Sequence, residues 1–189
     1  GLHYQKHGAL LRALYVGVER ALGKRTDRFI NVSGSERQAC LALGLLNVER
    51  SLVVCNGIDW QSFDTLTVDV QQVKADLGFD PNDVVVGHIA KFDVQKAQED
   101  LAAAIPFVLE KCPRAKFLFV GDGALRPQIE DQVARLGIDR QVVFTGYRDD
   151  VARLLKAIDV VALPSRWEGL SLVLLEAMAC RKPIVASRV

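Results

Sequence analysis

The chain has 189 residues, half of them hydrophobic, and a formal net charge of +1. This length can bury a core of one large domain or slightly more, and the near-neutral charge gives no general case for a nucleic-acid partner. The four scattered cysteines form no C-x-x-C pair, no apolar run approaches the ~18 residues that span a bilayer, and no signal peptide is visible. We therefore expect reduced thiols and a cytoplasmic protein, and since the chain starts without Met and stops just after an apolar stretch, a fragment of a longer protein.

Residues 3–24 have apolar side chains at helical spacing with basic residues between them. The pattern predicts a helix with one buried face, formed by Leu10, Leu11, Leu14, Val18, Ala21 and Leu22. Residues 1–35 carry six Lys or Arg against two acidic residues. The basic side of this helix is either an ordinary solvated face or a contact with anionic headgroups at the inner face of the membrane.

A short buried strand is expected at 29–32, followed by the capping box Ser33-x-x-Glu36 and a helix that ends near 43–44. A second strand is expected at 51–55. Asn56–Gly57 closes it with a strong turn signal. The irregular stretch 60–72 predicts a linker or a domain boundary.

From residue 70 onward, strands and helices alternate regularly. After a short helix that ends at 77–78, strands are expected at 84–90, 116–120, 142–145, 159–163 and 183–186, and helices at 98–111, 124–136, 149–157 and 170–180. Strict alternation with short polar turns predicts a Rossmann-like α/β fold, a parallel sheet with helices on both faces. Such sheets bind ligands at the carboxyl ends of their strands.

Two of the expected strand-to-helix turns carry groups suited to a phosphorylated ligand. Lys91, Asp93 and Lys96 follow the strand at 84–90, and two lysines five residues apart can neutralise a diphosphate, although each could be an ordinary exposed loop lysine. Gly121–Asp122–Gly123 follows the next strand but lacks the third glycine of G-x-G-x-x-G, so it could be a plain tight turn.

The other two turns hold Tyr147–Arg148 and Ser165 to Gly169. Tyr147 could be surface packing, whereas Glu168, wedged between Trp167 and Gly169, is a poor choice for stability alone and favours a functional role. Glu176 lies roughly 12 Å further along at ~1.5 Å per residue. Two carboxylates that far apart do not share a proton, but they can hold the two ends of an extended polar ligand.

The sequence also lacks several signatures. His88 lies in a buried strand and is expected to be a core histidine. There is no Asp-x-Asp, no His/Cys cluster with metal-ligand spacing, no P-loop and no G-x-S-x-G. What remains is a metal-free site for a nucleotide diphosphate.

The segment Glu168-x7-Glu176, followed by Ala-Met-Ala and preceded by Leu-Pro-Ser, resembles the retaining family 4 glycosyltransferases of the two-domain GT-B fold. The resemblance covers nearly the whole chain. It implies that residues 1–58 are the carboxyl end of an N-terminal, acceptor-side domain with the interdomain connection. Residues 59–189 would be the donor-binding domain, truncated at its carboxyl end.

The resemblance also implies roles for individual residues. Lys91, Lys96 and Glu168 would be the catalytic residues. The two lysines would hold the donor diphosphate, and Glu168 would contact hydroxyls of the donor sugar. Glu176 would accept hydrogen bonds from the ribose hydroxyls. The other donor-binding residues would be Gly121, Gly123, Tyr147, Arg148, Ser165, Gly169, Leu170 and Ser171. Ala97 and Arg181 stand where the family usually has glycine.

The implied activity is metal-independent transfer of a hexose, with retention, from a nucleotide-diphosphate sugar to a glycan or lipid-linked acceptor. A UDP-sugar is favoured and GDP-mannose is the second choice. The alternatives are a nucleotide-sugar-binding module without transfer activity and a GT-B-type epimerase. The resemblance implies that the chain alone is inactive, because most of the acceptor-side domain is missing.

Overall fold

The computed structural model describes residues 8–189, which group into two compact units. The first comprises the chain up to Gly57 together with Glu168–Ser171, and the second comprises Ile58–Trp167 and Leu172–Val189.

The first unit is built on two short parallel strands, β1 and β2, with a capped helix after the first. Its elements are α1 (Ala9–Gly23), β1 (Phe29–Asn31), α2 (Gly34–Ala42), the 3-10 turn η2 (Val48–Arg50) and β2 (Ser51–Val53). The Ser33 half of the capping box is confirmed, since Ser33 Oγ accepts the Glu36 N–H at 3.1 Å. Glu36 Oε2 accepts the N–H of Val32, one residue before the cap, at 3.1 Å.

The apolar face predicted for α1 is not buried. Leu10, Leu14, Val18 and Leu22 are 50–89% exposed, and Val16 is the buried residue of this helix. The first unit offers it only a small apolar cluster, Val16 and Leu45 with Cys40 and Leu43 packed around them. Residues 3–7, also predicted helical, lie outside the described residues. Within residues 8–189, no helix is long and apolar enough to cross a membrane.

The turn expected at Asn56–Gly57 is also wrong. Residues 54–59 form no turn, and Gly57 is not among the glycines with positive φ, which an Asn-Gly hairpin turn requires. Asn56 Nδ2 instead donates to the main-chain oxygen of Leu170 at 2.9 Å. The amide that could have stabilised a local turn therefore makes a long-range contact.

The second unit confirms the predicted parallel sheet. Its strands lie in the order β5-β4-β3-β6-β7, and every pair is parallel. They are β3 (Val84–Ile89), β4 (Ala115–Val120), β5 (Val142–Gly146), β6 (Val160–Leu163) and β7 (Ile184–Ala186). The helices are α3 (Trp60–Asp64), α4 (Val70–Asp76), α5 (Gln98–Lys111), α6 (Arg126–Arg135), α7 (Val151–Ala157) and α8 (Leu172–Ala179), with the 3-10 turns η3 (Val94–Lys96) and η4 (Asp139–Gln141).

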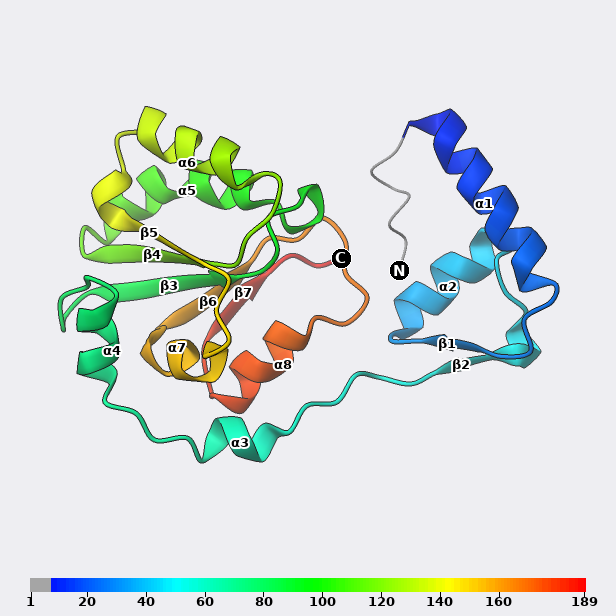
Figure 1. Ribbon diagram of the computed structural model, residues 1–189, viewed down its shortest axis with the longest axis horizontal. Helices are drawn as coiled ribbons and strands as arrows, with labels where there is room; N and C mark the ends of the chain where they lie inside the picture. The colour runs from blue at the N-terminus through cyan, green and yellow to red at the C-terminus, as the bar shows by residue number, and fades with distance from the viewer. Residues whose placement is uncertain (1–7) are drawn as a thin grey trace. The chain divides into compact units, whose positions relative to one another are not determined.

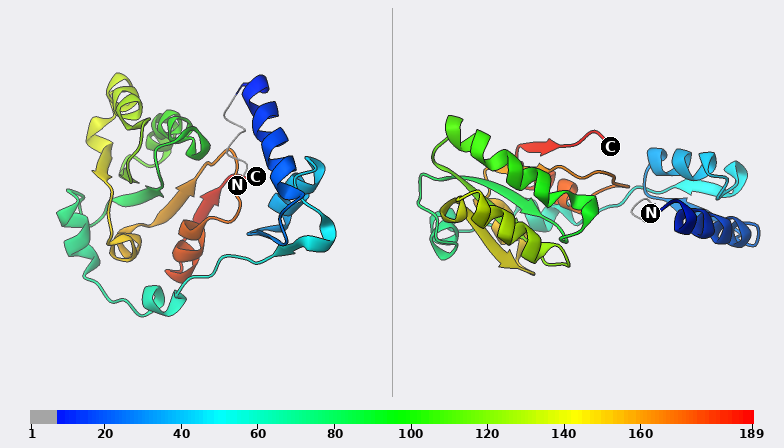
Figure 2. Two further views of the ribbon diagram at one scale, coloured as in Figure 1. Left: turned by 45° about the vertical axis from the view of Figure 1, so that its right-hand side comes forward. Right: turned by 90° about the horizontal axis from the view of Figure 1, so that it is seen from above.

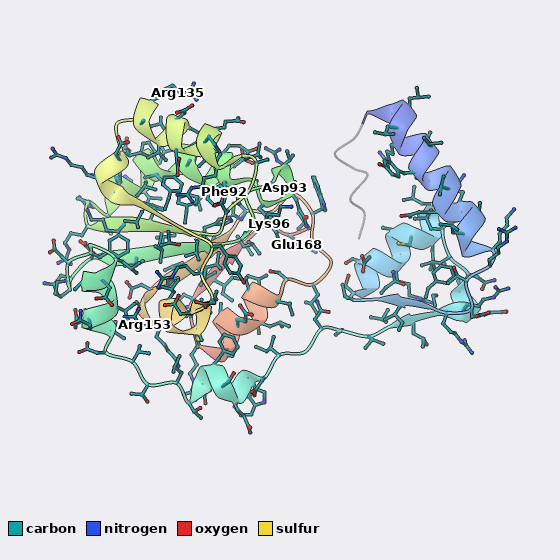
Figure 3. All side chains as sticks on the ribbon, in the orientation of Figure 1. Phe92, Asp93, Lys96, Arg135, Arg153 and Glu168 are labelled. Atoms are coloured by element: carbon teal, nitrogen blue, oxygen red, sulfur yellow. The ribbon has the colours of Figure 1, made fainter. Side chains whose placement is uncertain are left out.

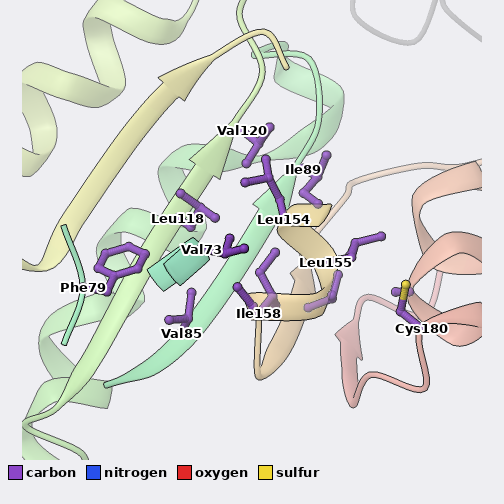
Figure 4. Close-up of a cluster of buried hydrophobic side chains, with 13 residues drawn as sticks. Val73, Phe79, Val85, Ile89, Leu118, Val120, Leu154, Leu155, Ile158 and Cys180 are labelled. Carbon is purple, nitrogen blue, oxygen red and sulfur yellow. The ribbon is translucent and has the colours of Figure 1, made fainter. Parts of the chain in front are cut away.

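Helices cover both faces of this sheet, with α5 and α6 on one side and α4, α7 and α8 on the other (Figures 1 and 2). Successive side chains of β4 point to opposite faces of the sheet and so pack into two separate cores. Leu118 and Val120 pack with α4 and α7 in the cluster of Figure 4, whereas Phe117 and Phe119 pack with α5 and α6. Burial on both faces explains why these strands are almost continuously apolar in the sequence.

The strand order creates a switch point between β3 and β6. The chain runs outward from β3 through β4 to β5, and then returns to the other side of β3 to form β6 and β7. At such a point, consecutive connections leave the sheet on opposite faces and open a crevice at the carboxyl ends of the two strands. The turns after β3 and β6 border that crevice.

Two glycines let the turn after β4 lie directly against the turn after β3. Gly121 has φ +128° and Gly123 has φ +155°. A Cβ atom would lie 2.1 Å from Ala90 O at the first position and 2.4 Å from Phe92 O at the second. Only glycine allows this approach of two backbones.

We expect Gly121→Ala to lower the free energy of unfolding by about 2 kcal/mol or more, because an unfavourable φ and a backbone clash coincide. Gly78→Ala is the matched control: its φ is +77°, but nothing lies within 4 Å of the added Cβ, so only the strain of about 1 kcal/mol applies. Urea denaturation measures both. Equal losses would show that the close approach to Ala90 carries no cost.

Candidate functional site

Side-chain hydrogen bonds fix the turn after β3 at both of its ends. Asp93 accepts the Gln95 N–H at the start of η3, and Gln98, fully buried, donates its side-chain amide to Lys91 O at 2.9 Å. Phe92, 1% exposed, anchors the middle of the turn against the rings of Phe119 and Phe144. Lys91 is exposed and Lys96 half-buried on this framework. Figure 3 shows Phe92, Asp93 and Lys96 together at the end of β3.

Main-chain hydrogen bonds join this turn to those after β4 and β5. Phe92 N donates to Asp122 O at 2.9 Å, and Gly121 N donates to Gly146 O at 2.8 Å. The turns after β3, β4 and β5 therefore lie together at one edge of the sheet. The arrangement places the lysine turn beside the turn that carries Gly121 and Gly123.

The turn after β5 carries Tyr147 and Arg148. Tyr147 is 82% exposed, so it is a surface residue whose ring is mostly free of contacts with the rest of the described protein. Arg148 binds Asp150 in a two-pronged ion pair, with both N–O distances 2.7 Å. These hydrogen bonds lower the pKa of Asp150 and raise that of Arg148. The main chain at Arg148 is thus fixed by a side-chain contact within the same turn.

Glu168–Ser171 form an irregular segment with a bend at Gly169, before α8, which begins at Leu172 and not at the predicted 170. In the first unit this segment meets Val32, whose Cγ2 lies 2.8 Å from where a Gly169 Cβ would stand. The carbonyl of Leu170 accepts the Asn56 amide. Glu168, Gly169 and Leu170 are half-buried, Ser171 is buried, and Ser165, just after β6, is 1% exposed.

Glu176 lies in the middle of α8 and is half-buried. Burial raises the pKa of this carboxyl above its ordinary 4.5, because the charged form loses water that no ion pair replaces. A desolvated carboxylate gains from hydroxyl donors, so the position suits a ligand that supplies them.

We expect Glu176→Gln to raise the Tm at pH 7. A raised pKa means that folding favours the protonated carboxyl. The stability that this protonated form contributes is complete below the ordinary pKa and is lost as the pH rises through the pKa of the folded state. The Tm gain of the variant should therefore vanish below pH 4.5 and grow above it. Glu110→Gln, at an exposed position of α5, is the control. A Tm difference that does not depend on pH would contradict this origin.

His88 is confirmed as a core histidine. It is fully buried, Nδ1 lies 2.9 Å from Ala162 O, and the ring packs against Phe119 at 5.7 Å between centroids. A carbonyl can only accept, so Nδ1 carries the proton. This hydrogen bond links β3 to β6 near the carboxyl ends of both strands.

The two positions noted as glycine replacements both adopt the left-handed conformation. Ala97 has φ 52° and Arg181 has φ 57°. Non-glycine residues tolerate this region at a cost of about 1–2 kcal/mol. At Arg181 an ion pair to Asp64, 3.0 Å long, accompanies that conformation.

Sequence reasoning missed Gln95, Asp150 and Arg166. Asp150 could have been found, because Arg-x-Asp within one turn is a local pairing. The partners of Gln95 and Arg166 lie 72 and 67 residues away in the chain, and nothing local signals them.

A parallel sheet with this strand order, glycine turns and a lysine-bearing turn at its switch point defines a nucleotide-binding α/β domain. The family model "Glycosyl transferases group 1" matches residues 83–189, more than half of the chain. The chain belongs to this family of transferases, and its solved structural relatives have the GT-B fold.

Several individual proteins are similar over most of the chain. The structure of Anabaena Alr3699/HepE in complex with UDP and glucose superimposes with a TM-score of 0.86 at 29% identity, covering 100% of this chain and 51% of that one. An Escherichia coli UDP-Gal:alpha-D-GlcNAc-diphosphoundecaprenol alpha-1,3-galactosyltransferase is 26% identical over 95% of this chain and 47% of its own length. A Bacillus anthracis N-acetyl-alpha-D-glucosaminyl L-malate synthase is 37% identical over 64% of this chain and 32% of its own. The chain thus spans about half the length of these relatives or less.

Proposed function

We propose that this chain supplies the donor site of a retaining hexosyltransferase that uses a nucleotide-diphosphate sugar, with UDP as the favoured nucleotide. The observation that carries the proposal is the turn Lys91–Lys96 at the β3–β6 switch point. It brings two cations and the glycine turns to the edge where a diphosphate binds in such sheets.

Each residue then has a distinct part in the proposal. Lys91 and Lys96 bind the diphosphate and stabilise the charge that develops as the nucleotide leaves. Glu168 binds sugar hydroxyls, beside the main chain of Gly169 and Leu170. Glu176 binds the ribose hydroxyls, for which its desolvated carboxylate is suited.

The nucleobase lies along the main chain at Tyr147–Arg148, which Asp150 holds in place. The remaining donor-binding residues of the proposal are Gly121, Gly123, Ser165 and Ser171. Because lysines supply the counter-charge, we propose that no metal ion is needed and that transfer survives chelation by EDTA.

The acceptor in the whole protein is proposed to be a glycan or a lipid-linked glycan. The E. coli relative is named for a diphosphoundecaprenol-linked acceptor, which supports this class. Retention would follow from attack on the same face as the leaving phosphate, with a donor phosphate oxygen taking the acceptor proton.

Titration calorimetry of the chain with UDP, GDP and ADP tests the donor site. We expect binding of UDP at least tenfold tighter than binding of the other two, in the absence of metal. No binding of any of the three would contradict the proposal, and a preference for GDP would shift it to GDP-mannose.

Activity assays of the complete protein distinguish the proposed function from its two alternatives. A binding module without transfer activity would bind UDP but release no sugar to any acceptor. An epimerase of the same fold would isomerise the donor reversibly without an acceptor. Sugar transfer with retention, seen by NMR of the product, contradicts both.

A further inference from the structure

The main-chain ladder between β3 and β6 stops before the turns that border the crevice. The two strands pair only at Val86–Val160 and Gly87–Val161. Beyond these pairs, His88 Nδ1 reaches Ala162 O. The strand pairing itself therefore does not extend to the lysine turn and the turn after β6.

Gln95 makes the contacts that join these two turns. Its carbonyl accepts the Arg166 N–H at 2.8 Å, and its side-chain amide donates to Trp167 O, also at 2.8 Å. Two hydrogen bonds from one residue to two consecutive residues fix both the separation and the orientation of the second turn. Gln95 immediately precedes Lys96, and Trp167 immediately precedes Glu168.

A second link runs parallel to the first. The Arg166 guanidinium binds Glu99 at 2.7 Å and Asp100 at 3.4 Å, both in the first turn of α5, directly after the lysine turn. Arg166 is itself exposed. This pair is therefore partly screened by solvent and is weaker than the half-buried contact of Gln95.

We propose that Gln95 is a positioning residue that sets the spacing between the phosphate-binding lysine turn and the segment that leads into Glu168. This inference rests on the proposed function. Gln95 touches no reacting group in it. Its amide holds the main chain at Trp167, the residue that directly precedes Glu168 in the chain. Positional errors of about 1 Å can cost about 100-fold in rate, which gives such a contact a large effect on turnover.

The test is a graded series at this position, with Gln71→Met, at an exposed position of α4, as the matched control. Gln95→Met keeps the length of the side chain and the main-chain bond to Arg166, but removes the amide donor. Gln95→Glu places an acceptor against the Trp167 carbonyl. We expect kcat of the complete protein to fall about tenfold in the first variant and further in the second, with no change in the control.

Binding of UDP and of UDP-glucose to each variant separates positioning from loss of structure. We expect the Kd for UDP to stay within twofold in Gln95→Met, because the lysine turn and α8, which carry the groups proposed to bind UDP, each keep their other contacts. The gain in affinity from UDP to UDP-glucose is expected to be lost. A kcat of Gln95→Met equal to the unchanged protein overturns the inference. Parallel loss of UDP binding and Tm also overturns it, since the role is then structural. Failure of the unchanged chain to bind any of UDP, GDP and ADP overturns the proposed function itself.

Discussion

Replacement of Lys96 by alanine is expected to lower kcat of the complete protein by about 10²–10³. The charge on the diphosphate increases as the sugar departs, so a lysine beside it stabilises the transition state more than the ground state. The half-buried position of Lys96, on a turn fixed by Phe92 and Gln98, makes that charge pre-organised and poorly screened. Steady-state kinetics with UDP-glucose measures the effect.

Lys111→Ala, at an exposed position of α5, is the control for loss of one positive charge. Lys96→Arg should recover part of the rate, because it keeps the charge but changes its geometry. A rate for Lys96→Ala within threefold of the unchanged protein would contradict the proposed role of this turn.

Replacement of Glu168 by alanine is expected to lower kcat by a similar factor of about 10²–10³, with little change in the Kd for UDP. A carboxylate that grips sugar hydroxyls orients the reacting carbon and contributes nothing to binding of the nucleotide alone. Kinetics with UDP-glucose and calorimetry with UDP separate the two effects.

Glu176→Gln should show the opposite pattern. Loss of charge-assisted hydrogen bonds to ribose weakens UDP binding by about tenfold, roughly 1.4 kcal/mol, while kcat at saturating donor changes less. If both glutamate variants lost UDP affinity equally, the assignment of one to the sugar and the other to the ribose would be wrong.

Local chemistry made much of the architecture predictable. The apolar runs from Val84 onward are buried on both faces, so they show continuous hydrophobicity, and their alternation with helical patterns leaves a parallel sheet as the arrangement that short connections permit. The helix at Gln98–Lys111 was located to the residue, since a polar turn precedes it and its apolar spacing is regular.

The two wrong predictions, a buried apolar face on α1 and a turn at Asn56–Gly57, share a cause. The apolar face of α1 has the pattern of a buried helix, but burial needs a neighbour, and the first unit supplies little more than Leu45. Asn56–Gly57 has the local preference for a turn, but a distant carbonyl at Leu170 captures the amide. In both cases the outcome depends on groups that are far away in the sequence.

The sequence by itself determined which chemical groups follow the strands along the chain: two lysines after β3, two glycines after β4 and two spaced glutamates after β6. Only the tertiary structure decided that β3 and β6 are neighbours, so that the lysine turn borders the switch point. It also decided that Gln95 joins that turn to Trp167. The physical reason is that side-chain period and turn chemistry act over a few residues, whereas strand order and the partner of a glutamine 72 positions away follow from how whole layers pack.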